Sequence, residues 1–142
     1  MKSGKIFSVL FLISVFFVSC DALQKATNST GSAFSLTGQW QLQSNTPDNS
    51  SIGTKVTVAP FVSEARITGL IGSSYCFREN DVLWKDIAAD NAGGFSINNL
   101  VNGCNGLIYK PAQIAVVNKD EVRVSGKNAN GNDMQQIWKR IK

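Results

Sequence analysis

The stretch Leu36-Thr37-Gly38-Gln39-Trp40-Gln41-Leu42-Gln43 (LTGQWQLQ) decides the fold class of this chain. Apolar or small residues alternate in it with polar residues. Successive side chains of a β-strand point to opposite faces, so this period predicts a strand with one face in a core and the other in solvent.

Further short strand-like runs follow along the rest of the chain. No window shows a long helical stripe, and tight-turn residues separate the runs. The spacing predicts an all-β domain, an antiparallel meander of about eight strands, and a small closed or nearly closed barrel would remove its exposed edges. Further strand-like runs lie at 55–59, 64–68, 82–87, 95–100, 107–109, 113–118, 121–125 and 135–141.

Residues at both ends of this domain resemble the signature of the lipocalins and avidins, the calycin barrels. Gly38-Gln39-Trp40 is similar to their opening Gly-x-Trp, in which the glycine lets the first strand bend and the tryptophan closes one end of the barrel. The resemblance implies that Arg140, on the last run, packs across Trp40. The residues alone also fit an ordinary core tryptophan and an exposed terminal arginine.

The first 19 residues are typical of a signal peptide. Lys2 and Lys5 form a basic segment, and residues 6–18 form an apolar or small-residue run. This run is shorter than the roughly 20 residues that a transmembrane helix needs, and it fits the apolar region of a signal peptide. We therefore expect an exported protein.

The run ends at Phe17-Val18-Ser19-Cys20, which resembles the lipobox of bacterial lipoproteins. The resemblance implies cleavage before Cys20 and its diacylation. We expect a lipid-anchored membrane protein of the bacterial cell envelope, facing the periplasm or the cell surface. Phe17 stands where leucine is usual, so cleavage slightly later and secretion of a soluble protein is the alternative.

Residues 20–35 are expected to carry the lipid-anchor cysteine and a flexible tether, and residues 36–142 a single β-domain. The tether is polar and small in composition, with too few apolar residues to fold alone. A flexible segment of this length spans about 20 Å on average, enough to hold a domain off a membrane surface.

Three cysteines are present, and Cys76 and Cys104 remain as an even pair if Cys20 carries lipid. An exported protein meets an oxidising compartment, so a disulfide between them is expected. A metal site and a catalytic thiol are the alternatives. The chain contains no histidine, which removes the Cys–His and Ser–His–Asp arrangements and most zinc sites.

Composition argues against several function classes. The net charge is +4 and the basic residues are scattered, so nucleic-acid binding has no support. No nucleophile–base pair, metal-ligand spacing or phosphate-binding glycine loop is present, so we expect no enzymatic activity, no metal and no cofactor. A hydrolase is the remaining enzymatic alternative.

We expect a lipocalin-like binding module for a small apolar or amphipathic ligand, since barrels of about eight strands can hold one such ligand. The candidate lining residues are Tyr75, Phe77, Trp84 and Tyr109, each of which also fits ordinary packing. The alternative is a protein-interaction or inhibitor lipoprotein that binds an envelope protein through its outer face and loops. A deep apolar cavity would favour the binding of a small ligand, whereas a filled barrel with an exposed aromatic patch would favour a protein partner.

Overall fold

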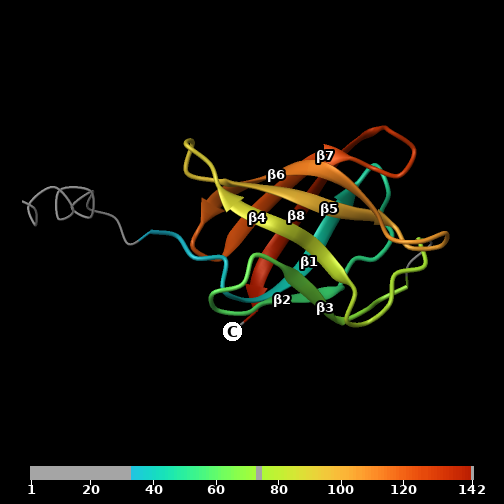
Figure 1. Ribbon diagram of the computed structural model, residues 1–142, viewed down its shortest axis with the longest axis horizontal. Helices are drawn as coiled ribbons and strands as arrows, with labels where there is room; N and C mark the ends of the chain where they lie inside the picture. Colours follow the sequence, from blue (N-terminus) through green and yellow to red (C-terminus); the bar gives the residue numbers. More distant parts are fainter. Residues whose placement is uncertain (1–32, 73–74, 142) are drawn as a thin grey trace, which may run out of the picture. The chain divides into compact units, whose positions relative to one another are not determined.

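The chain folds into a closed antiparallel β-barrel, as Figure 1 shows for the computed structural model, which describes residues 33–72 and 75–141. Each strand pairs with the next along the chain, and the last pairs with the first. This confirms the predicted all-β meander. The strands are β1 (Gly38–Thr46), β2 (Lys55–Val58), β3 (Ala65–Gly69), β4 (Val82–Ala89), β5 (Phe95–Asn102), β6 (Ile108–Asn118), β7 (Glu121–Lys127) and β8 (Asp133–Ile141).

The barrel belongs to a compact unit that begins at Phe34. The predicted signal peptide, Cys20 and almost all of the predicted tether lie outside the described residues. Among the residues that are described, no helix is long and apolar enough to cross a membrane.

Closure depends on the pairing of β1 with β8. Trp40 lies opposite Arg140, and Leu42 lies opposite Trp138. Trp40, Leu42 and Trp138 are all buried, so the inward face of β1 meets the inward face of β8. The alternation of apolar and polar residues in β1 therefore matches the face that β1 turns toward the core where it pairs with β8.

The prediction of two separate strand-like runs at 107–109 and 113–118 was wrong. One continuous strand spans both, with Pro111 inside it. Proline lacks a backbone donor and is tolerated at strand positions that have a free side. Pro111 pairs with Asn98 of β5, whereas pairing with β7 starts only at Ala112. A partner on one side only explains how the proline fits.

Three tryptophans dominate the barrel interior. Trp40, Trp84 and Trp138 are at most 1% exposed. The rings of Trp84 and Trp138 meet edge to face with centroids 5.1 Å apart, an arrangement that aromatic pairs prefer. These side chains fill most of the space that a larger cavity would need.

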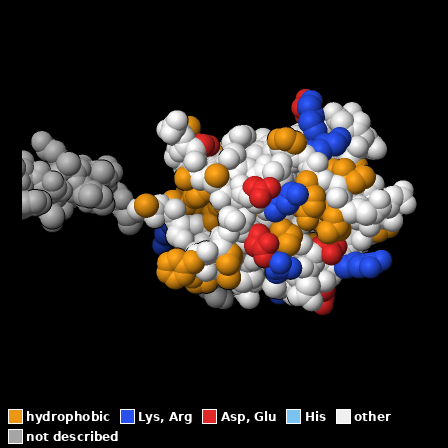
Figure 2. All heavy atoms as spheres, viewed as in Figure 1, with side chains coloured by type: hydrophobic (Ala, Val, Ile, Leu, Met, Phe, Trp, Pro, Cys, Tyr) orange, Lys and Arg blue, Asp and Glu red, His pale blue; other side chains and the backbone are white. Residues whose placement is uncertain are grey.

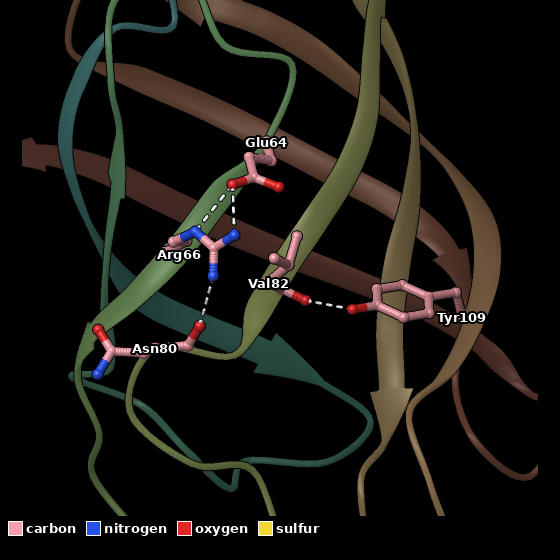
Figure 3. Close-up of polar contacts among 5 residues, drawn as sticks. All are labelled: Glu64, Arg66, Asn80, Val82 and Tyr109. Atoms are coloured by element: carbon pink, nitrogen blue, oxygen red, sulfur yellow. Dashed lines mark hydrogen bonds and ion pairs between the residues drawn. The ribbon is translucent and has the colours of Figure 1, made fainter.

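The pairing of β3 with β4 is the shortest in the barrel, with two paired positions and an irregularity between them. A polar contact on the outer surface reinforces this seam (Figure 3). Arg66 pairs with Glu64 at 2.7 Å and donates to the carbonyl of Asn80 at 3.1 Å. The side chain thus connects β3 to the segment that leads into β4.

The meander gives the barrel two different ends. At one end, here called the entry end, the chain enters at Phe34, and connections 59–64, 90–94 and 119–120 lie beside it (Figure 1). At the other, here called the mouth, are connections 47–54, 70–81, 103–107 and 128–132.

Candidate functional site

A small cavity opens at the mouth of the barrel. Its volume is about 40 Å³. One water needs about 10–15 Å³ on this scale, so the cavity has room for about three water-sized groups. The lining is mixed, with apolar residues from the strands and polar residues mostly near the connections: Leu42, Asn45, Pro47, Asp48, Ser51, Thr54, Tyr75, Phe77, Leu83, Asn99, Leu100, Val101, Asn128, Ala129, Met134, Gln136 and Trp138.

One wall of the cavity is a chain of hydrogen bonds. Trp138 Nε1 donates to Gln136 Oε1 at 3.0 Å, and Gln136 Nε2 donates to Asn45 Oδ1 at 3.3 Å. Asn45 Nδ2 in turn donates to the carbonyl of Ser50 at 3.3 Å. The network joins β8, β1 and the β1–β2 connection, so it holds the polar groups of this wall in fixed positions.

Two polar atoms in the interior are unpaired. Asn99 and Trp84 lie opposite each other on β5 and β4 and are 2% and 0% exposed. Within the described chain, Asn99 Oδ1 and Trp84 Nε1 have no hydrogen-bond partner. A buried polar group in this state costs about 1–3 kcal/mol. Asn99 lines the cavity, so this buried, unpaired acceptor belongs to a residue at the cavity wall.

Asp48 brings a charge to the rim. The Tyr75 hydroxyl donates to its carboxylate, which also accepts from the backbone and hydroxyl of Ser50 at 2.9 Å each. These bonds, the one from Tyr75 first, lower the pKa of Asp48 below its ordinary 3.8. The same bond to Asp48 raises the pKa of Tyr75 above its ordinary 10.0. The rim therefore carries a carboxylate at neutral pH.

The predicted disulfide is present and lies beside this rim. Cys76 and Cys104 are joined with Cα atoms 4.9 Å apart, linking the β3–β4 and β5–β6 connections. The backbone of Gly103 also donates to the carbonyl of Tyr75 at 2.8 Å. Tyr75 and Phe77 flank Cys76, and their ring centroids are 6.0 Å apart. The crosslink thus holds two aromatic lining residues at the mouth.

The four candidate lining residues separate into two groups. Tyr75 and Phe77 line the cavity. Trp84 is buried in the core and does not belong to the lining. Tyr109 does not line the cavity; it is half-buried on β6 opposite Leu100 and packs against the core. There its hydroxyl donates to the carbonyl of Val82 at 2.8 Å (Figure 3).

The sequence analysis did not predict that buried asparagine and glutamine side chains line the cavity. Asn45, Asn99, Asn128 and Gln136 are each at most 8% exposed. A signal existed for Asn99, which follows Ile97 on the inward face of β5 and breaks its apolar pattern. A polar residue at a core position of a strand is a candidate for a buried site.

At the entry end, Gly38, Trp40 and Arg140 lie together. The guanidinium carbon of Arg140 is 4.2 Å from the centre of the Trp40 ring, within the range of a cation–π contact. Gly38 has φ of 128°, and a Cβ there would lie 2.9 Å from Arg140 Nη1. The backbone conformation therefore favours glycine here, and a larger side chain would also displace the Arg140 guanidinium.

A metal-site search and comparisons with known proteins do not identify a function. No group of three or more histidine, cysteine, aspartate or glutamate side chains that could hold a metal occurs in the described ranges. Comparisons with protein-family models, curated proteins and solved structures give no match to this chain.

Proposed function

We propose that this protein is a lipid-anchored lipoprotein of the bacterial envelope whose lipocalin-like barrel binds a small amphipathic group at its mouth. The observation that carries the proposal is a mixed cavity with Asn99 in its lining, a residue whose Oδ1 acceptor is buried and unpaired among the described residues. Binding sites combine an apolar lining with a few placed polar groups, and this cavity has that character.

The size and charge of the site narrow the ligand class. A cavity of about 40 Å³ accepts the end of a molecule rather than a whole lipid. Both Asn99 Oδ1, which a small side-chain movement would expose, and the Asp48 carboxylate are acceptors. The expected ligand therefore supplies an N–H or O–H donor and carries no negative charge at that end. A neutral amide or hydroxyl, or an amine, on an apolar stem meets these requirements.

Native mass spectrometry of the protein purified from its own envelope tests the proposal. We expect a retained mass on the wild type that is lost in Ala129→Phe, because a phenyl ring at this lining position fills the cavity. Ala92→Phe is the matched control, in an exposed turn at the entry end, and keeps the mass. A wild-type barrel that carries no additional mass would contradict ligand binding.

A protein partner is the second candidate, and a separate observation favours it. Three of the four connections at the mouth expose apolar side chains, namely Ile52, Ile71 and Leu107, which are 40–58% exposed. A protruding side chain of an envelope protein would then occupy the cavity while these residues form the surrounding contact. Crosslinking from position 107 in intact cells separates this candidate from a free small ligand.

A further inference from the structure

Phe61 is the most exposed apolar side chain among the described residues. Its exposure is 108%, and its neighbour Val62 is 45% exposed. Phe61 also has φ of 63°, a left-handed conformation that is a genuine outlier for a bulky residue. The turn therefore holds a phenyl ring fully in solvent, although a glycine or asparagine would fit the backbone better.

This turn lies at the entry end. It connects β2 to β3, at the end of the barrel where β1 begins (Figure 1). Phe34 lies at the same end, with its ring centroid 6.2 Å from those of Trp40 and Phe95. Figure 2 shows hydrophobic side chains gathered on this part of the surface. The cavity, the disulfide and the exposed Leu107 lie at the mouth, at the far end of the strands.

The charges around the turn nearly cancel. Glu64 pairs with Arg66 at 2.7 Å, and Lys119 lies 3.9 Å from Asp120. Lys139 lies 3.8 Å from Glu121 at the start of β7. Arg140 and Asp90 add one charge of each sign to the described part of this end. A neutral surface with a protruding apolar tip favours insertion by the hydrophobic effect over attraction to a charged partner.

We propose that Phe61 and Val62 insert into the lipid surface to which the chain is anchored, so that the entry end faces the membrane. The inference rests on the proposed lipid anchor. Cys20 precedes Phe34 by 14 residues, and such a tether spans about 20 Å. A short flexible link creates an effective concentration in the millimolar range, so one or two apolar side chains suffice to orient the barrel. The mouth then faces the aqueous side.

The test uses the mature chain from Asp21 with an N-terminal hexahistidine tag on vesicles that contain a nickel-chelating lipid. The core and disulfide are complete within the unit that begins at Phe34, so folding does not depend on the anchor. The chain has no histidine of its own, so the tag alone attaches it. Phe61→Trp is compared with Leu107→Trp, an exposed apolar position at the mouth, using lipids with brominated acyl chains.

We expect the emission of the tryptophan at position 61 to shift to the blue and to be quenched by the brominated chains. Emission from position 107 should keep its wavelength and intensity, after subtraction of the three buried tryptophans. Without the chelating lipid, Phe61→Ala should weaken partitioning of the protein into zwitterionic vesicles about tenfold, with little effect of salt.

Equal quenching at both positions, or quenching at neither, would overturn the inference. A blue shift at position 61 that grows with protein concentration in the absence of vesicles would overturn it in favour of a second copy of the chain. Since the tag replaces the lipid, these outcomes are independent of acylation. Failure of Cys20 to take up fatty acid contradicts the proposed anchor instead.

Discussion

Arg140 organises the entry end of the barrel. Its guanidinium donates to the carbonyls of Thr37, Ser35 and Lys119 at 2.6–3.0 Å, and it stacks on Trp40. A planar fork with five donors is suited to binding several carbonyls at once. The resemblance of Gly38-Gln39-Trp40 to the opening of the calycin barrels implied this contact. Alternation alone puts Trp138 and Arg140 on one face of the last strand and leaves open whether that face points inward.

Arg140→Ala should lower the free energy of unfolding by about 1–3 kcal/mol, because it leaves three carbonyls and the Trp40 ring without their partner. Urea denaturation gives the value. Arg123→Ala, at an exposed position of β7, is the matched control and should change stability by less than about 0.5 kcal/mol. Equal effects of the two substitutions would contradict the role given to Arg140.

Asn99→Leu should stabilise the empty barrel by about 1 kcal/mol, because it replaces an unpaired buried acceptor with an apolar group of similar size. The same change should abolish retention of ligand at the mouth. Asn45→Leu is the control, since both polar atoms of that amide are paired, and it should destabilise. The two variants are compared by thermal unfolding and native mass spectrometry. A loss of stability in Asn99→Leu would show that its oxygen has a partner.

The positions of the strands could be predicted from the sequence, but the unbroken course of β6 could not. Alternating runs and turn residues located all eight strands, because both are local properties of the chain. The continuity of β6 across Pro111 depends on where β7 begins to pair, which no local pattern encodes. The disulfide was predictable from the count of cysteines and the expected compartment.

Removal of the disulfide should be costly. The double variant Cys76→Ser, Cys104→Ser should lose about 3.5 kcal/mol, the chain-entropy value for a crosslink that closes a segment of 28 residues. Guanidinium denaturation of the variant and of the reduced wild type should agree. A loss much below 1 kcal/mol would show that the hydrogen bond from Gly103 to Tyr75 holds the mouth without the crosslink.

The hydrogen bond between Asp48 and Tyr75 should make stability depend on pH at two extremes. Because the folded pKa of Asp48 is lowered, its contribution is present above pH about 4 and is lost as the pH falls through the folded value. Because the folded pKa of Tyr75 is raised, its contribution is present below pH about 10 and is lost as the pH rises through the folded value. The difference in urea midpoint between wild type and Tyr75→Phe should therefore be constant near neutrality and shrink at both ends.

For the whole molecule, the barrel could be predicted but the size of its cavity could not. Closure follows from the number of strands and the need to pair the edges. The cavity depends on how Trp84 and Trp138 pack against each other across the interior, which is a tertiary property. The sequence therefore predicted a ligand-lining role for Trp84, a residue that instead packs in the core.

Cys20→Ala should abolish labelling of the protein by an alkyne fatty acid and move it out of the membrane fraction. The physical reason is that a diacylated cysteine holds a protein stably on a bilayer, whereas one acyl chain binds only marginally. The double serine variant of Cys76 and Cys104 keeps Cys20 and should label as the wild type does. Unchanged fractionation of Cys20→Ala would count against an anchor at this residue.

The pairing of β1 with β8 also makes the order of the strands around the barrel independent of where the chain starts. Phe34, which shortly precedes β1, and Ile141 of the neighbouring strand β8 lie at the same end. A circular permutant can therefore join them with a short glycine linker and open the exposed turn between β7 and β8, leaving every ladder intact. Its new termini would lie at the mouth, so the same barrel could be attached to a surface by its mouth instead of its entry end.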